Sequence, residues 1–357
     1  MIYVEMKRLF YIHDIQDLWL FNSLLKKGDT LVYNKTSNKC TAPHWFLDQL
    51  QDFKLISFKG DFNALNTLID NFDQFITKEG LPFSADYLSS NPSVRKRNKT
   101  KLISLGWIGE SATTSTPYYR AVKNNCKLHF CAQQLVPVYQ ALGFKNVSGQ
   151  EPKFVALNSL CRESGCSILN LDPSQKYATF IISSGGGLAR KGLLKNLYSS
   201  SNQQLVHSIY EYCADNNIKI ILKSKLKHQK NKEGLKGDIS LEGNNIFYHQ
   251  SLLLMNISEF TVGFGSSAAL ESEVIEAPYV NFLPSPRYSD TNKPYENWLN
   301  PSPQRPAVHS HLAQSSNVFN ISPDDSLRPN RASLISFIDN ASAPNFQKKH
   351  ILHPVFQ

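Results

Sequence analysis

The stretch "VGFGSSAALESEVIEAPYVNF", residues 262–282, contains the features that decide the fold. An apolar run reaches a turn with two glycines and two serines, an apolar segment with three glutamates follows, and Ala-Pro introduces a second β-rich run. This order predicts a strand, a tight turn, a helix and another strand, the repeating unit of a parallel sheet. The turn either holds an anion at the start of the helix, with Ser266 and Ser267 as donors, or is a corner in which one serine is an N-cap.

The same alternation occupies most of the chain. Apolar runs typical of strands lie at 8–13, 29–34, 53–60, 101–110, 127–132, 177–187, 218–225, 245–250, 259–265 and 278–284. Amphipathic segments predict helices at 14–28, 61–80, 116–125, 133–144, 202–217 and 333–341. Residues 145–176 lack clear periodicity, which indicates a domain boundary. We therefore expect an α/β protein with two Rossmann-like, doubly wound domains facing each other across a cleft, at 1–160 and 161–340, and a tail at 341–357.

The composition is that of a globular protein with a basic surface. The 357 residues carry a net charge of +9, which favours an anionic partner. The densest basic run, "SVRKRNKTK" at 93–101, is either a solvated loop or a loop drawn to an anionic membrane surface. No basic motif interleaved with aromatic residues occurs, so no nucleic-acid partner is expected. The start of the chain predicts a strand, not a targeting segment, and no apolar run is long enough for a transmembrane helix.

The cysteines and the motif content indicate no metal site. Of the six cysteines, two pairs have C-x4-C spacing and none has the C-x2-C spacing of zinc ribbons. We expect reduced, mostly buried thiols, as in a cytosolic protein. No D-x-D pair of the kind that holds a metal–nucleotide complex is present. The prediction is therefore no metal and no cofactor.

Two further segments carry candidate anion-binding residues. In "ISSGGGLARKG" (182–192), Ser184, Gly185 and Gly186 follow a predicted strand and form either a phosphate cradle or a flexible loop. In "IILKSKLKHQK" (220–230), three lysines and a histidine lie just past a predicted strand end, and alternation puts the lysines on the same side. They form either a basic wall opposite a phosphate or a solvated edge. The residues of that second segment are Lys223, Lys225, Lys227 and His228.

Two carboxylates of the first half are candidates for a general base. Glu110 ends "GWIGE", and Asp14 follows the first predicted strand in "IHD". A carboxylate at the carboxyl end of a strand is well placed to deprotonate an acceptor hydroxyl. A residue of this kind on its own is more often a helix cap or a residue at the edge of the core, which is the alternative for both.

The block "FYHQSLLLMNISEFTVGFGSSAALESEVIEAPYVNF" (247–282) resembles a segment of GT-B-fold glycosyltransferases that make bacterial surface polysaccharides. Similar blocks occur in nucleotide-sugar 2-epimerases, in glycerophosphate transferases, and, for the paired serines, in sialyl- and Kdo-transferases. The resemblance implies that Gly265, Ser266 and Ser267 contact the nucleotide phosphate and that Glu271 contacts the ribose. Two departures stand out: the Lys-Pro-His-Pro-like element lacks its prolines around His228, and position 279 is Tyr where many members have a second Glu.

The resemblance implies a metal-independent transferase that moves a sugar from a nucleotide-activated donor, a UDP-sugar or a CMP-linked acidic sugar such as Kdo. Domain 161–340 would bind the donor, and domain 1–160 would bind a glycan or lipid-linked acceptor in capsule or lipopolysaccharide synthesis. The expected location is cytoplasmic, peripheral on the inner face of the bacterial inner membrane. The alternatives are a nucleotide-sugar 2-epimerase and a non-catalytic nucleotide-sugar-binding protein of a polysaccharide assembly complex.

Overall fold

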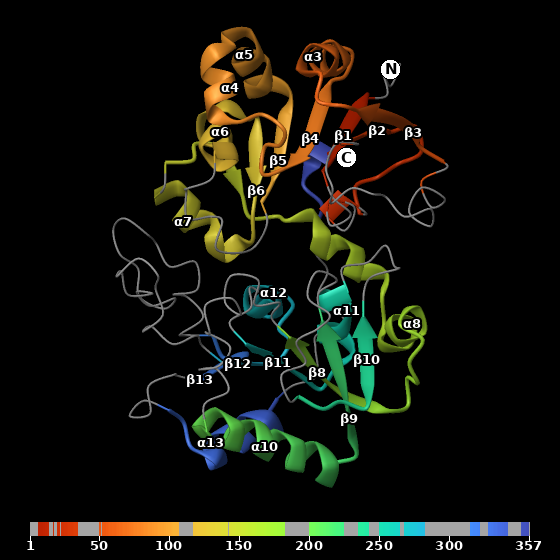
Figure 1. Ribbon diagram of the computed structural model, residues 1–357, viewed down its shortest axis with the longest axis vertical. Coiled ribbons are helices and arrows are strands. Elements are labelled where there is room, and N and C mark those ends of the chain that lie inside the picture. The colour runs from red at the N-terminus through yellow and green to blue at the C-terminus, as the bar shows by residue number, and fades with distance from the viewer. Residues whose placement is uncertain are drawn as a thin grey trace. The chain divides into compact units, whose positions relative to one another are not determined.

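The fold is seen in a computed structural model (Figure 1). It describes residues 6–13, 17, 20–21, 23–34, 50, 52–106, 117–141, 143–182, 200–224, 235–242, 250–264, 268–282, 315–321, 328–341 and 351–356. The chain forms two compact units. Unit 1 comprises residues 1–156, 247–249 and 349–357, and unit 2 comprises 157–246 and 250–348.

Unit 1 is built on a seven-stranded parallel sheet. Its strands are β1 (Arg8–Ile12), β2 (Thr30–Asn34), β3 (Lys54–Phe58), β4 (Gln74–Lys78), β5 (Leu102–Leu105), β6 (Leu128–Phe130) and β7 (Val147–Ser148). They are arranged in the order β3-β2-β1-β4-β5-β6-β7. The first six follow the strand order of Rossmann domains, in which the direction of winding reverses between the first and fourth strands. Ligands of such sheets bind at this switch point, outside the carboxyl ends of the strands.

Helices and the end of the chain cover this sheet. The helices are α3 (Phe62–Asp70), α4 (Ala85–Ser90), α5 (Pro92–Lys101), α6 (Pro117–Asn125) and α7 (Val136–Ala141), with a 3-10 turn at Gln133–Leu135. β1 and β4 are buried along their whole length, as expected for central strands with both faces covered. The short 3-10 turn Pro354–Phe356 brings Phe356 into the core, with its ring centroid 4.9 Å from that of Phe130. Gln74 Nε2 donates a hydrogen bond to the carbonyl of Val355 at 2.8 Å.

The prediction of one helix over 61–80 is wrong in its second half. Asp61 caps α3 as expected, accepting from the backbone N–H groups of Asn63 and Ala64. The helix ends at Asp70, and Gln74–Lys78 forms the central strand β4. The apolar residues of β4, Phe75 and Ile76, continue the spacing of three and four residues found in α3, so periodicity alone does not separate this strand from a helix.

The basic run at 93–101 is also helical, where a loop was expected. Pro92 occupies the first turn of α5, a position that needs no backbone N–H. Val94 and Asn98, four residues apart, are its buried residues. The basic residues therefore extend from a packed helix.

Unit 2 is built on a six-stranded parallel sheet. Its strands are β8 (Lys176–Ile182), β9 (Ile218–Ser224), β10 (Ile239–Glu242), β11 (Phe260–Phe264), β12 (Tyr279–Phe282) and β13 (Val318–Ile321). Their order, β10-β9-β8-β11-β12-β13, repeats the Rossmann order with its own first strand at β8. The switch point of unit 2 therefore lies between β8 and β11.

Helices cover both faces of this second sheet (Figure 1). α10 (Ser200–Asp215) and α13 (Arg331–Asp339) lie on one face, and α11 (Gln250–Ile257) and α12 (Ala268–Val274) lie on the other. The first face holds the large apolar core of unit 2, in which the aromatic rings of Phe264 and Phe282 stack at 4.9 Å. The boundary segment carries a 3-10 helix at Pro152–Ser159 and helix α8 (Arg162–Ile168).

Two strands of unit 2 do not match the sequence prediction. β10 and β13 were not expected, because each is short and lies at an edge of the sheet. The strand expected at 245–250 lies outside the described residues except for Gln250, which begins α11. The expected helix at 14–28 is described only in part, and it is wrong at its end, because residues 23–28 are turn and coil.

The described cysteines agree with the expected reduced thiols. Cys126, Cys131, Cys166 and Cys213 are buried and free, and Cys161 is free and exposed. Burial raises the pKa of Cys126 and of Cys213 to about 12, which keeps these thiols protonated. Within the described ranges, no group of His, Cys, Asp and Glu residues could hold a metal ion. Nor is any helix described there long and apolar enough to cross a membrane.

Candidate nucleotide site in unit 2

The switch point of unit 2 brings together three segments that are far apart in the sequence. β8 pairs with β11 on one side and with β9 on the other, all in parallel. β8 ends at Ile182, β9 at Ser224 and β11 at Phe264. The segments "SSGGG", "KLKH" and "GSS" begin directly after these three neighbouring strand ends. The strand ends that precede the three candidate segments therefore lie side by side at the same edge of the sheet.

One row of residues lies in register just inside this edge. Across the sheet, the row runs through Leu241, Lys223, Ile181, Gly263, Asn281 and Asn320. Lys223 is only 5% exposed, so it is not part of a solvated edge. At the other side of the row, Asn281 Nδ2 donates to Asn320 Oδ1 at 2.9 Å. The row is polar on both sides of a centre formed by Ile181 and Gly263.

Gly263 is explained by packing. It lies within β11, and a Cβ atom added to it would be 1.7 Å from the hydroxyl oxygen of Tyr279. The buried Tyr279 side chain from β12 therefore occupies the space above this glycine. The sequence suggested that Gly263 allows the backbone to bend in a tight turn. The structure shows it inside a strand, where the missing side chain makes room for the ring of Tyr279.

Glu271 lies in the first turn of α12 and is 4% exposed. A carboxylate in the first turn interacts favourably with the positive end of its own helix dipole. This interaction gives Glu271 a structural role in addition to the predicted ribose contact, which stays a prediction.

The remaining predicted site residues lie outside the described residues. They are Asp14, Glu110, Ser184, Gly185, Gly186, Lys225, His228, Gly265, Ser266 and Ser267, and Lys227 lies outside as well. The structure thus places Lys223 and Glu271, together with the strand ends that precede most of the other predicted residues.

The switch point of unit 1, between β1 and β4, holds a pair that the sequence did not indicate. Lys78, the last residue of β4, contacts Asp17 with Nζ 2.9 Å from Oδ1. Asp17 also accepts a hydrogen bond from the backbone N–H of His13 at 2.6 Å, and its side chain is fully buried. Asp17 lies three residues after the predicted base, Asp14. Only the pairing of β1 with β4 makes it the partner of Lys78.

A buried histidine lies two strands further along this sheet. His129 on β6 is in register with Ser104 on β5, and its Nδ1 lies 3.2 Å from Ser104 Oγ. The rings of Tyr139 and Phe144 pack against it at 4.8 and 5.3 Å. Burial lowers the pKa of His129 to about 3, so the imidazole is neutral at physiological pH.

Solved structures with a similar fold include nucleotide-sugar 2-epimerases. A Listeria monocytogenes protein described as a UDP-N-acetylglucosamine 2-epimerase has a TM-score of 0.56 and 10% identity, over 96% of this chain and 91% of that chain. The UDP-GlcNAc 2-epimerase of Methanocaldococcus jannaschii, in complex with UDP-GlcNAc and UDP, has a TM-score of 0.52 and 8% identity, over 98% and 97%. S. aureus MnaA, solved with UDP, has a TM-score of 0.53 and 10% identity, over 97% and 91%.

The chain has a GT-B-type fold. Both sheets have the Rossmann strand order, and the similarity to these structures extends over nearly the whole chain. This confirms the fold class expected from the sequence. No protein-family model and no curated protein matches the sequence. At 8 to 10% identity, the similarity concerns the fold.

Proposed function

We propose that this protein is an enzyme that binds a nucleotide-activated sugar at the switch point of unit 2 and transfers the sugar to an acceptor. The observation that carries the proposal is the adjacency of β8 and β11, because the two glycine- and serine-containing segments follow directly from these strands. Rossmann domains bind their ligands at this position. Two of the structures with similar folds contain UDP.

In the proposed reaction, the acceptor hydroxyl oxygen attacks the anomeric carbon of the donor sugar. The bond from that carbon to the phosphate oxygen breaks, and the nucleotide leaves with the electron pair. The hydroxyl proton passes to a carboxylate, for which Glu110 and Asp14 are the candidates. Backbone N–H groups and hydroxyls of the two segments would stabilise the departing phosphate, with Lys223 and Lys225 adding positive charge. The donor-site residues would be Ser184, Gly185, Gly186, His228, Gly265, Ser266, Ser267 and Glu271.

A thermal-shift screen with UDP, GDP, CDP and CMP at equal concentrations tests the donor site. A nucleotide that binds the folded state raises the midpoint of thermal unfolding by mass action. We expect a shift with at least one nucleotide, and we expect the double variant Ser266→Ala/Ser267→Ala to lose it. Ser93→Ala, an exposed serine of α5, is the control and should keep the full shift. The donor-site assignment is wrong if no nucleotide shifts the midpoint or if the double variant responds like the unmodified protein.

A second candidate is a nucleotide-sugar 2-epimerase, favoured by the fold similarity to such enzymes over 96 to 98% of the chain. The two reactions differ in their need for an acceptor. Incubation with UDP-GlcNAc alone, followed by proton NMR, would reveal inversion at C2 of the sugar for an epimerase. For a transferase, the donor would stay intact until an acceptor is added. Nucleotide binding without turnover in either assay would support a non-catalytic binding protein.

Helix α5 gives the proposed transferase a membrane-facing surface. Arg97 and Lys101 contact helix α3, through the carboxylate of Asp70 and its carbonyl oxygen, respectively. Arg95, Lys96 and Lys99 are exposed and make no ion pair or hydrogen bond within the described part of the chain. Lipid-linked acceptors lie in membranes with anionic head groups, and each exposed cation near such a surface contributes about 1 kcal/mol.

Vesicle sedimentation tests this surface. With vesicles containing phosphatidylserine, replacing Arg95, Lys96 and Lys99 by Ala should weaken binding about a hundredfold at low salt. A variant with Lys54, Lys59 and Lys127 replaced by Ala removes the same charge from other exposed positions and should bind more tightly than the α5 variant. Equal loss in the two variants would show that only net charge matters. That result would contradict a role for α5.

A further inference from the structure

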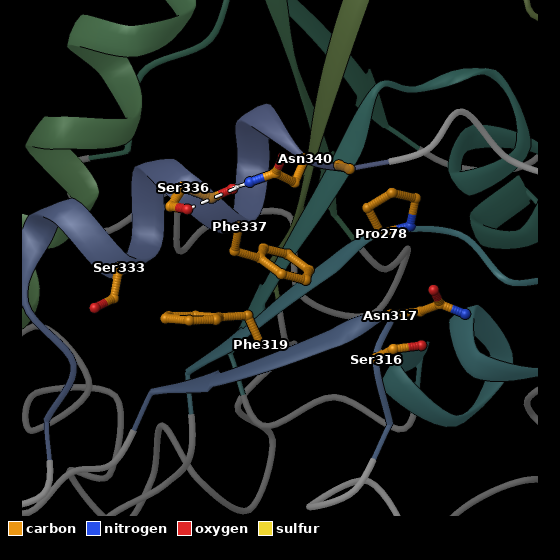
Figure 2. A pocket seen from close by; sticks show the side chains of 9 residues that line it. Pro278, Ser316, Asn317, Phe319, Ser333, Ser336, Phe337 and Asn340 are labelled. Carbon is orange, nitrogen blue, oxygen red and sulfur yellow. Dashed lines mark hydrogen bonds between the residues drawn. The ribbon is translucent and has the colours of Figure 1, made fainter.

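A cavity of about 600 Å³ opens at the amino-terminal edge of the second sheet, beside α13 (Figure 2). Pro278 directly precedes β12, and Ser316 and Asn317 directly precede β13, so the cavity lies where these strands begin. The candidate nucleotide site lies at the opposite edge, where the strands end. A strand of four residues separates the two edges by about 10 Å. The cavity is therefore separate from the nucleotide site.

The floor of the cavity is aromatic. Phe319 from β13 and Phe337 from α13 stack with ring centroids 5.2 Å apart and an interplanar angle of 30°. Figure 2 shows the two rings directed toward each other from the strand and the helix. Both are half-buried, and both line the cavity while packing against the apolar core. Leu334 and Ile338, which are buried, hold α13 on the sheet and so fix this floor.

The described residues of the rim are polar and uncharged. Asn317, Ser333, Ser336 and Asn340 line the cavity, and none of the lining residues that the structure describes is Lys, Arg, His, Asp or Glu. The backbone carbonyl of Asn317 accepts a hydrogen bond from the N–H of Tyr279 at 2.8 Å. Its carboxamide makes no hydrogen bond to any residue that the structure describes. Asn317 is thus fixed by its backbone and offers both a donor and an acceptor to a ligand.

We propose that this cavity binds a neutral saccharide of one or two sugar residues. A sugar ring has an apolar C–H face, which matches the Phe319–Phe337 floor, and hydroxyls at its edge, which match the amides and hydroxyls of the rim. A charged ligand would lose hydration without meeting an opposite charge. A wholly apolar ligand would cover the carboxamides without pairing them. The volume is in the range of small-ligand pockets.

The site has a use in an enzyme that extends a glycan. Sugar residues of the acceptor remote from the reacting hydroxyl would bind here and keep a growing chain attached to unit 2. This use rests on the proposed function, whereas saccharide binding itself rests only on the lining of the cavity. The two are therefore tested separately.

Saturation-transfer-difference NMR on the full chain tests the binding. The probes are the methyl glycosides of glucose, galactose and N-acetylglucosamine, together with maltose and cellobiose. The Ser266→Ala/Ser267→Ala variant serves as the background, so that the proposed nucleotide site does not contribute. We expect transfer to the ring C–H protons of at least one probe. Inorganic phosphate and acetate should not displace that probe.

Two substitutions locate the binding. Phe319→Leu keeps an apolar side chain but removes the ring, and Asn317→Ala removes the free carboxamide; each should raise the dissociation constant about fivefold. Asn124→Ala changes an exposed asparagine of α6 and should leave it unchanged. If Phe319→Leu fails to fold, Asn317→Ala decides alone.

Three results would overturn the proposal: no transfer to any probe, displacement by phosphate, or binding that neither substitution weakens. Saccharide binding by a chain that binds no nucleotide would leave this proposal standing and remove the proposed function. Nucleotide binding without saccharide binding would leave the proposed function standing and remove the saccharide site.

Discussion

At the switch point of unit 1, Lys78 and Asp17 form a buried ion pair next to the ends of β1 and β4. At the switch point of unit 2, the corresponding strands β8 and β11 carry Ile181 and Gly263 in register, and the hydroxyl of Tyr279 lies over the glycine. The strand order is the same in both sheets. The strand order thus fixes where the switch point of each sheet lies. The side chains determine whether that point contains a buried ion pair, as in unit 1, or a glycine packed under an aromatic residue, as in unit 2.

Removing the charge pair of unit 1 should have the largest effect on stability. Asp17→Asn neutralises the carboxylate that Lys78 contacts in a buried ion pair, which should lower the free energy of unfolding by about 3–5 kcal/mol. Urea unfolding at pH 7 measures this change. Asp70→Asn removes a carboxylate that is 65% exposed and pairs with Arg97, and should cost no more than about 1 kcal/mol. Similar losses in the two variants would show that burial of the Asp17 pair has no special weight.

Filling the space in unit 2 should have the next largest effect. Gly263→Ala places a methyl group against the Tyr279 hydroxyl and should cost roughly 1–3 kcal/mol through overpacking. In the double variant Gly263→Ala/Tyr279→Leu, the clash is relieved, so the total loss should be smaller than the sum of the two single losses. Urea unfolding of the four proteins in this cycle measures the coupling. Additive losses would contradict the packing explanation for the glycine.

Acidification should lower the stability of unit 1 because His129 is buried in its neutral form. Its pKa is about 3 in the folded protein, against 6.5 for an ordinary histidine, so below about pH 6.5 the unfolded state binds a proton that the folded state does not. Stability is thus lost as the pH falls from about 6.5 toward 3. Between pH 7 and pH 5, this loss amounts to about 2 kcal/mol.

Urea unfolding of His129→Gln at both pH values isolates this contribution, since the variant should lose about 2 kcal/mol less on acidification than the unmodified protein. His207→Gln is the control, because His207 is 73% exposed and lies in unit 2. An unchanged acid response in His129→Gln would contradict a neutral buried imidazole.

The smallest effects concern a pair of matched helix caps. Asp61 caps α3 in unit 1, and Asn330 caps α13 in unit 2 by accepting from the N–H of Ser333 at 2.9 Å. Asp61→Ala and Asn330→Ala should each cost about 1 kcal/mol. Calorimetry would show whether the units unfold separately, since each variant should then lower only the transition of its own unit. If neither variant lowers any transition, the caps do not contribute as described.

The sequence was most informative where apolar runs met turn residues. The strands around 8–13, 177–187 and 259–265 and the helices around 116–125, 202–217 and 333–341 lie where the pattern put them. β4 was missed because its apolar residues continue the periodicity of α3 without a strong turn signal. β10 and β13 were missed because short edge strands leave a weak pattern.

The sequence predicted which segments contribute to the candidate site, but it did not predict how the strands before them are arranged. Residues 183–187 and 265–267 were recognisable from their glycines and serines. The sequence did not show that the strands before them, β8 and β11, pair with each other, because these strands are about 80 residues apart in the chain. The Asp17–Lys78 pair depends likewise on the pairing of β1 with β4. The need for a glycine at position 263 was also not predictable, because it comes from the side chain of Tyr279 on the next strand.

The position of Phe356 has a consequence for synthesis on the ribosome. Domains generally begin to fold in the order in which they emerge, so residues 1–156 are available long before unit 2 is complete. The core around Phe130 lacks its last aromatic partner until residue 356 has been made. Throughout the translation of unit 2, the first unit therefore lacks one of the residues of its apolar core. The first unit to start folding is therefore the last to finish.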